Sequence, residues 1–381
     1  MDPSSFVIHN ARLILRDRVV GNGWIAVADG VIAEVGEGHA PEKGLDVGGA
    51  TVGPGLVELH TDHLEQHFQP RPAVCWPALS AVLAYDAQIA ASGITTVFDS
   101  LRAGVEGRRD VVSASLGVLA DAIAEAGARG LLRADHLTHL RCEICAHDVI
   151  EVTRDFVARH PIHLMSLMDH TPGQRQFQDV EKFLTYYRGK TALTEEQLQE
   201  LIAQRIAANV ERSEPHRRAL VALAQANGVA LASHDDATLD HVAESVADGV
   251  SIAEFPTTTA AARASHEAGI SVLMGAPNLV RGGSHSGNVS AETLAREGTL
   301  DIFSSDYVPA SLLQAALELP RRVPAISLPD AFATVSDNPA RAAGLHDRGR
   351  IAPGLRADLV CLHEGEPPAV RAVWREGRRV V

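Results

Sequence analysis

The stretch GPGLVELHTDHLE at residues 53–65 decides the fold that we predict. Its Gly-Pro-Gly turn separates two kinds of sequence. After the turn, a short apolar run of strand length ends near His60 and Asp62, and further apolar runs alternate with long, alanine-rich amphipathic stretches. Such alternation of strand-length and helix-length segments is typical of a parallel sheet built from βα units.

Eight apolar runs of strand length follow one another beyond this turn. They lie at residues 56–60, 94–98, 136–144, 162–168, 229–233, 251–255, 271–274 and 300–304. Eight strand–helix units over roughly 290 residues match the size of a (β/α)8 TIM barrel. We therefore predict an α/β fold with this barrel at residues 53–346 and a helical insertion at about 174–227. An open, doubly wound sheet is the alternative, which is disfavoured because no Gly-x-Gly-x-x-Gly follows the first run.

The two ends of the chain differ from its middle. Residues 1–52 and 347–381 consist of short strand-like segments broken by Asn, Asp and Gly turns. We predict that these two segments together form one small β-sandwich domain beside the barrel.

Bulk composition restricts the partners of the protein. The 381 residues include 34 basic and 48 acidic side chains, and the net charge of −14 disfavours nucleic acid and anionic membranes as partners. The apolar runs are too short for a membrane span and residues 1–5 lack signal-peptide features, so we expect a cytoplasmic protein. A small anionic substrate stays compatible with this charge, because local arginines and bound metal outweigh a distant negative surface. A homo-oligomer is also compatible with the sequence.

Side chains that bind metals recur where the predicted strands end. The positions are His60 and Asp62, Glu143, Asp169 and His170, His234 to Asp236, and Asp306. Barrel active sites are built at the carboxyl ends of the strands, so these groups should converge. A single histidine at a strand end is more often a hydrogen-bonded structural residue, but five such ends in register favour a divalent metal centre. Zinc suits these ligands first, with manganese, iron or nickel as alternatives.

Two carboxylates have candidate roles at this centre. Glu143 could bridge and so support two ions, which together would stabilise charge on the reacting group. Asp306 is our candidate for the general base, since a carboxylate beside a dication stays ionised and could hydrogen-bond the attacking water. Asp306 could instead act only as a ligand, and the two roles are compatible.

A second group of residues suits phosphate. Residues 275–288, after the seventh run, combine glycines with polar donors, and loops in this position of barrels often bind phosphate. The donors are Asn278, Arg281, Ser284, His285 and Asn288. Arg71, Arg141 and Arg175 could add paired contacts to phosphate oxygens, although each alone is as often a surface or ion-paired residue.

Taken together, these segments resemble the amidohydrolase superfamily and, within it, the diphosphatases of the carbon–phosphorus lyase pathway. The matching segments are 54–65, 67–72, 140–143, 167–174, 233–236, 253–258, 274–288 and 304–309. The resemblance implies metal-dependent hydrolysis of α-D-ribose 1-methylphosphonate 5-triphosphate to the 5-phosphate and diphosphate. It also implies a ligand set of His60, Asp62, Glu143, His170, His234 and Asp306.

The chain departs from the general superfamily pattern in two places. That pattern has His-x-His on the first strand and often a carboxylated lysine as the bridge between metals. Asp62 and Glu143 take those places here, and His63 is the alternative to Asp62.

Two other functions stay open at this point. An amidohydrolase or deaminase acting on a cyclic amide or nucleobase would use the same metal cluster, but the arginine-bearing loops and the lack of a bridging-lysine candidate count against it. A non-catalytic scaffold on the same fold would typically have lost metal ligands, whereas every ligand position here is filled.

Overall fold

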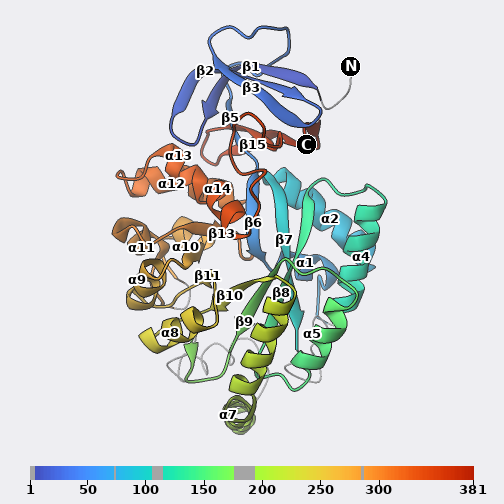
Figure 1. The fold of residues 1–381 in the computed structure, drawn as a ribbon, viewed down its shortest axis with the longest axis vertical. Helices are drawn as coiled ribbons and strands as arrows, with labels where there is room; N and C mark the ends of the chain where they lie inside the picture. The colour runs from blue at the N-terminus through green and yellow to red at the C-terminus, as the bar shows by residue number, and fades with distance from the viewer. Residues whose placement is uncertain (1–4, 73, 105–114, 176–193, 285–286) are drawn as a thin grey trace.

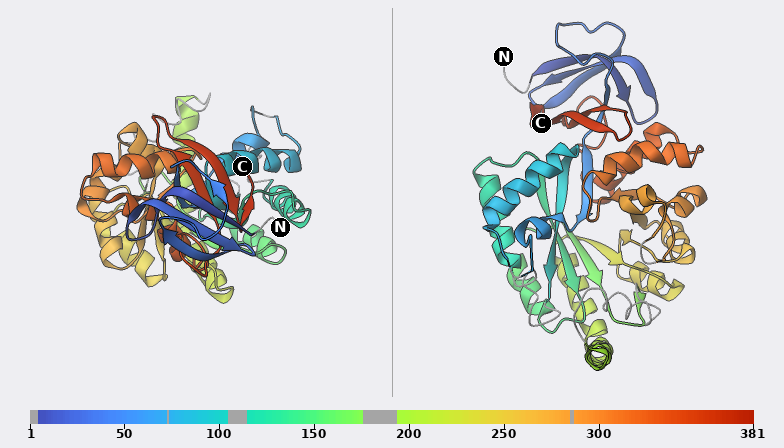
Figure 2. Two further views of the ribbon diagram at one scale, coloured as in Figure 1. Left: turned by 90° about the horizontal axis from the view of Figure 1, so that it is seen from above. Right: turned by 180° about the vertical axis from the view of Figure 1, so that it is seen from behind.

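Two sheets of eight strands each organise the chain (Figure 1). The computed structural model describes residues 5–72, 74–104, 115–175, 194–284 and 287–381. One sheet belongs to a barrel and the other to a small domain at one end of it. The N-terminal and C-terminal segments both lie in this small domain (Figure 2).

The small domain joins the first and last segments of the chain. Its strands are β1 Phe6–Ile14, β2 Val19–Ala28, β3 Val31–Glu37, β4 Leu45–Asp46, β5 Thr51–Pro54, β14 Leu359–His363, β15 Ala369–Arg375 and β16 Arg378–Arg379. They follow the order β16-β15-β14-β5-β1-β2-β3, with β4 beside β1. The antiparallel pair β14–β5 links the two chain ends, and Ile8, Ile25, Val52 and Leu359 are fully buried in the core of this domain. The sheet predicted from both termini is confirmed.

The barrel consists of eight parallel strands in sequence order. They are β6 Leu56–Thr61, β7 Ile94–Ala103, β8 Asp135–Glu143, β9 Leu164–Met168, β10 Ala230–His234, β11 Ile252–Glu254, β12 Ser271–Gly275 and β13 Ile302–Ser304. Each overlaps one of the eight predicted runs, which confirms the TIM-barrel prediction. The first and last strands meet at their carboxyl ends, where the N–H of Asp306 donates to the carbonyl of His60 (3.1 Å) and the N–H of Asp62 donates to the carbonyl of Asp306 (3.0 Å).

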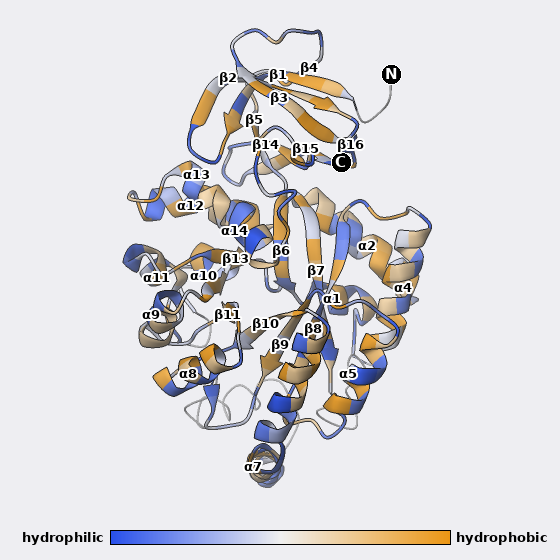
Figure 3. Ribbon diagram, viewed as in Figure 1, coloured by the Kyte–Doolittle hydropathy of each residue, from blue (hydrophilic) through white to orange (hydrophobic). Residues whose placement is uncertain are grey.

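Helices surround the barrel. They are α1 His63–Phe68, α2 Ala78–Ala91, α4 Leu116–Ala128, α5 Val149–Val157, α7 Glu195–Ala226, α8 Leu239–Ala247, α9 Thr259–Glu267, α10 Ala276–Arg281, α11 Ala291–Glu297, α12 Ser311–Arg322, α13 Leu328–Ala333 and α14 Asp337–Ala342. Hydrophobic and hydrophilic residues alternate along them, as expected for amphipathic helices that cover a sheet (Figure 3). None of the described helices has both the length and the apolar character needed to cross a membrane.

The longest helix, α7, is the described part of the predicted insertion. Thr194 precedes it and accepts a hydrogen bond from the backbone N–H of Gln197, whose side chain in turn accepts from the N–H of Thr194. This reciprocal pair is a capping box, which satisfies two backbone donors at the start of the helix.

Apolar side chains fill the barrel interior. Val57, Phe98, Leu164, Ile252 and Leu273 form a buried cluster between the strands. Nearer the carboxyl ends of the strands, polar side chains replace them. The candidate site therefore lies on top of a packed apolar layer and not in an open pore.

Candidate metal centre

Three histidines from different strands lie side by side at the carboxyl end of the barrel. His60 lies in β6, His234 is the last residue of β10, and His170 follows β9 by two residues. The ring centroids of His60 and His234 are 5.6 Å apart, and those of His234 and His170 are 5.7 Å apart. His60 and His234 are buried and His170 is half-buried. The structure thus brings together three residues that lie far apart in the sequence.

A β-bulge in β6 turns His60 into the barrel. The pairing of β6 with β7 shifts register within residues 58–61, where β6 contains one extra residue. Such a bulge re-aims side chains, so that Leu59 and His60 both face the interior. Leu59 packs in the apolar interior cluster, and Nδ1 of His60 lies 2.9 Å from the carboxylate of Glu254. Regular strand alternation therefore does not hold between residues 58 and 61.

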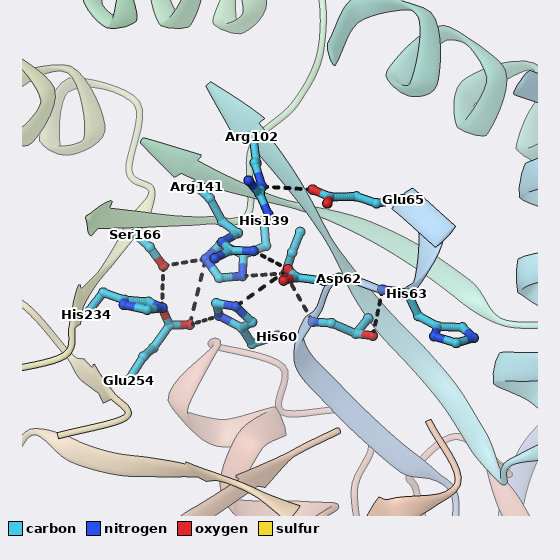
Figure 4. A network of polar contacts seen from close by, with 12 residues as sticks. His60, Asp62, His63, Glu65, Arg102, His139, Arg141, Ser166, His234 and Glu254 are labelled. Carbon is cyan, nitrogen blue, oxygen red and sulfur yellow. Dashed lines mark hydrogen bonds and ion pairs between the residues drawn. The ribbon is translucent and has the colours of Figure 1, made fainter. Parts of the chain in front are cut away.

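Asp62 reaches the same centre from just beyond the strand. It precedes α1, and its Oδ1 atom lies 4.0 Å from Nε2 of His60. Burial alone would raise the pKa of Asp62, but the ion pair with Arg141 holds this pKa well below its usual range. The ring of His63, the alternative ligand, points away from His60 and contacts Gln88 of α2 (Figure 4).

Glu143 brings a carboxylate to His170. It is the last residue of β8, is only 5% exposed, and its Oε2 atom lies 2.6 Å from Nδ1 of His170. Among the described residues, potential ligand atoms lie within 4.8 Å of one another in three groups, namely Glu143, Cys145 and Asp169; His170, His234 and Asp235; and His60, His139 and Glu254. The first two groups lie at the ends of β8, β9 and β10.

The backbone of Asp306 is held in an uncommon conformation. Its φ is 54°. Asp235 and Phe255, which directly follow β10 and β11, have similar φ values of 58° and 54°. Left-handed backbone is rare for residues other than glycine and tends to persist at functional sites, where the surroundings maintain it. The backbone hydrogen bonds to β6 place Asp306 next to His60, with its side chain half-buried.

The donor set fits divalent cations. It consists of imidazole nitrogens and carboxylate oxygens, which zinc and related metals bind at about 2.0–2.2 Å. Two such ligands on one ion lie at most about 4.4 Å apart, and Nε2 of His60 and Oδ1 of Asp62 meet this limit at 4.0 Å. The residues that the structure brings together can therefore hold such an ion.

A fully buried polar layer lies beneath the histidines. Oε2 of Glu254 accepts a hydrogen bond of 2.6 Å from Ser166, and this hydroxyl also contacts Nε2 of His139. The other ring nitrogen of His139 lies 2.8 Å from the carbonyl oxygen of Leu59. Burial lowers the pKa of His139 to about 3. Burial alone would raise the pKa of Glu254, but the adjacent His60 holds it well below its usual range.

The three predicted phosphate-binding arginines occupy different environments. Arg141 is buried beside Asp62, within the site. The guanidinium of Arg175 is also buried but forms ion pairs with Asp236 and Glu244, an arrangement that fits a structural role. Arg71 is exposed beyond α1.

Much of the predicted glycine-rich loop at 275–288 is a helix. Residues 276–281 form α10 because Pro277 suits the first turn and Gly282, at φ 83°, ends the helix in the left-handed conformation. The loop prediction was wrong for these residues, since its glycines lie at the ends of the segment and leave a helix-compatible stretch between them.

The predicted donors of this segment are spread along α10 and beyond it. The side chain of Asn278 accepts from the backbone N–H of Ala291 at 3.0 Å and so fixes the connection to α11. Arg281 is exposed, and Ser284 and Asn288 are half-buried. His285 lies outside the described residues.

Two charged residues of the site were missed from the sequence. Glu254 ends β11 as Glu143 ends β8, and the same strand-end criterion would have identified it. Arg102 lies near the end of β7 with its side chain 36% exposed, and its Nε atom is 2.9 Å from the carboxylate of Glu65 in α1 (Figure 4). Arg102 was harder to predict from the sequence, because β7 extends five residues beyond the predicted run.

Known proteins are similar to this chain in sequence and in architecture. The chain is 48% identical over 379 residues to the alpha-D-ribose 1-methylphosphonate 5-triphosphate diphosphatase of Escherichia coli (strain K12), which covers 98% of this chain and 100% of that protein. Solved structures with the same fold include N-acetyl-D-glucosamine-6-phosphate deacetylase from Mycobacterium smegmatis (TM-score 0.65, 19% identity, 99% and 100% coverage). Another is 5-methylcytosine deaminase from Klebsiella pneumoniae (TM-score 0.66, 16% identity, 98% and 97% coverage).

A family model supports the same relationship. Residues 76–381 match the model described as "Amidohydrolase family". This match spans most of the barrel and the C-terminal part of the small domain. Together with the full-length relative, it shows that the chain belongs to the amidohydrolase family.

Proposed function

We propose that the protein hydrolyses α-D-ribose 1-methylphosphonate 5-triphosphate, releases diphosphate and leaves the 5-phosphate. The observation that carries this proposal is the 48% identity to the Escherichia coli enzyme named for this substrate, over the whole of that enzyme. The site is consistent with the activity, because histidines and carboxylates converge next to arginines that suit a polyphosphate. The deacetylase and the deaminase support only the fold.

The metal requirement follows from the donor set. The residues that would hold one or two divalent cations, with zinc as the first candidate, are His60, Asp62, Glu143, His170, His234 and Asp306. When bound, such cations polarise phosphoryl oxygens and neutralise the charge that develops on them.

The protein groups have separate tasks in the proposed reaction. Asp306 accepts the proton of the attacking water, from a position that its backbone bonds to β6 maintain. Arg141 and Arg102 orient the triphosphate. Arg141 lies next to the proposed metal ligand Asp62, and the side chain of Arg102 is partly exposed and so accessible to substrate. Ser284 and Asn288, beyond α10, would extend the phosphate site.

Phosphorus NMR of the products tests the proposal. Zinc-loaded protein should convert the ribosyl methylphosphonate triphosphate to diphosphate and the 5-phosphate, and ATP in parallel shows how much the ribosyl phosphonate contributes. Chelation should remove this activity and zinc should restore it. Release of inorganic phosphate instead of diphosphate would contradict the reaction.

The other activities of the fold serve as the comparison. The same metal-loaded protein is incubated with hydantoin and with cytosine. Turnover of either one without diphosphate release would replace the proposal with an amidohydrolase or deaminase function. Metal binding without turnover of any of these substrates would favour the scaffold.

A further inference from the structure

Glu254 lies directly behind His60 and was not among the predicted ligands. We propose that Glu254 is a positioning residue, which fixes the ring of His60 so that Nε2 faces the metal centre. This inference rests on the proposed role of His60 as a metal ligand. It assigns a task to a fully buried carboxylate that the reaction itself does not use.

The hydrogen bond between the two residues determines the tautomer of His60. A carboxylate only accepts hydrogen bonds, so Nδ1, at 2.9 Å from Oε1 of Glu254, must carry a proton and donate it. The lone pair of a neutral ring then lies on Nε2, the atom that faces Asp62 at 4.0 Å. Carboxylates that hold metal-binding histidines in this way orient the ring and raise its basicity as a ligand.

The surroundings hold Glu254 in place. Its second oxygen accepts a hydrogen bond of 2.6 Å from Ser166, which lies on β9. The next residue, Phe255, has a φ of 54°, and its ring packs edge-on to His60 with the centroids 5.0 Å apart. The ring of His60 is therefore confined at Nδ1 and on one side, whereas Nε2 faces the site.

A second buried glutamate offers a matched control. Glu58 also contacts His60, but its carboxylate accepts from the backbone N–H groups of His60 (2.7 Å) and Ser305 (2.6 Å) and does not contact the imidazole. Glu58 and Glu254 are both fully buried. Replacing Glu58 by glutamine therefore disturbs the same neighbourhood without removing the acceptor for Nδ1.

Metal affinity is the measurement that separates positioning from general stability. Zinc affinity of the full chain is determined by competition with a chromophoric chelator for the wild type, Glu254→Gln and Glu58→Gln. We expect Glu254→Gln to weaken zinc binding by about 10–100-fold, the usual effect of removing a carboxylate behind a metal-binding histidine. Cobalt-loaded Glu254→Gln should also have an altered visible spectrum, since the coordination changes. Glu58→Gln should mainly lower the melting temperature of the metal-free protein.

Each result decides the matter. Wild-type zinc affinity and an unchanged cobalt spectrum in Glu254→Gln would overturn the inference, as would equal weakening in both glutamine variants. If Glu254→Gln fails to fold, Ser166→Ala takes its place. We expect zinc affinity in this variant to fall by roughly threefold to tenfold, because Glu254 loses only its hydrogen bond from Ser166. Wild-type zinc affinity in Ser166→Ala would overturn the inference. A wild type that binds no metal refutes the inference together with the metal centre, whereas one that binds zinc without releasing diphosphate refutes the proposed function alone.

Discussion

Strand β8 has a charged cluster at each end, and the two clusters are built differently. At its first residue, Asp135, a single carboxylate accepts from three guanidinium groups, those of Arg348 at 2.8 Å, Arg356 at 2.6 Å and Arg375 at 3.0 Å. At its last residue, Glu143, the carboxylate meets the imidazole of His170 at 2.6 Å. Opposite charges pair at the first end, whereas several electron-pair donors converge at the second.

The amino end of β8 therefore contributes to stability, whereas its carboxyl end belongs to the candidate site. Arg375 belongs to β15, so the Asp135 cluster ties the small domain to the amino end of the barrel. Asp347 and Asp358 also pair with two of these arginines, so the charges at this end of the strand compensate one another. Converging carboxylates and imidazoles, in contrast, are costly to bury together unless a cation joins them. Removing a charge should therefore affect folding at the amino end and turnover at the carboxyl end.

Asp306→Asn should have the largest effect on the carboxyl end. Loss of the proposed base should reduce kcat by about a hundredfold or more, as is typical for general-base catalysis. The backbone bonds of Asp306 to β6 persist in this variant, so the melting temperature should stay close to that of the wild type. Diphosphate release at saturating substrate and a thermal melt measure the two quantities. Near-full activity would remove Asp306 from the proton transfer.

Asp135→Asn should produce the opposite pattern at the amino end. Three guanidinium groups lose their shared partner, and we expect the free energy of unfolding to fall by about 2 kcal/mol. The kcat of the folded enzyme should not change. Urea denaturation measures the loss, with Asp347→Asn as the control, because Asp347 also pairs with Arg348 but its side chain is 51% exposed. A lowered kcat at full folding would mean that the two ends of β8 are coupled.

The sequence predicted one of these clusters and not the other. His60, Glu143 and Asp306 each lie within two residues of the end of an apolar run, and the barrel topology then makes these ends converge. The Asp135 cluster joins residues more than 200 positions apart whose partners depend on how the small domain docks. No local pattern in the sequence encodes such a contact.

Within the site, sequence patterns carry no signal for the irregular parts of the backbone. The bulge in β6 and the left-handed Phe255 decide which way His60 and Glu254 point, and neither leaves a periodic signal. Arg175 matched the expectation of a cation near the site, but the acidic residues that surround it come from other segments.

Arg102→Gln tests whether a cation at the carboxyl end binds substrate. We expect KM for the triphosphate to rise about tenfold with a smaller change in kcat, since a charge-assisted hydrogen bond contributes about 1.5 kcal/mol. Arg263→Gln is the matched control, because Arg263 is also partly exposed and ion-paired, with Glu297, but lies on α9. Initial rates over a range of substrate concentrations give both constants. Equal KM in both variants and the wild type would exclude Arg102 from substrate binding.

The smallest expected effect is the pH dependence of the stability that Asp135 contributes at the junction between the domains. Burial alone would raise the pKa of Asp135, but Arg356 and Arg375 outweigh this and lower it below the ordinary value of 3.8. A carboxyl group with a lowered pKa in the folded state contributes stability above its unfolded pKa and loses this contribution as the pH falls through the folded pKa. The stability difference between the wild type and Asp135→Asn should therefore be constant above about pH 5 and should shrink below about pH 4.

Denaturation of the two metal-free proteins at pH 6 and pH 3.5 measures this change, which we expect to be under about 1 kcal/mol because the arginines delay protonation of Asp135. Without metal, titration of the ligands at the carboxyl end affects both proteins equally and cancels in the difference. A stability difference that is the same at pH 6 and at pH 3.5 would mean that the shape of the Asp135 side chain, and not its charge, joins the small domain to the barrel.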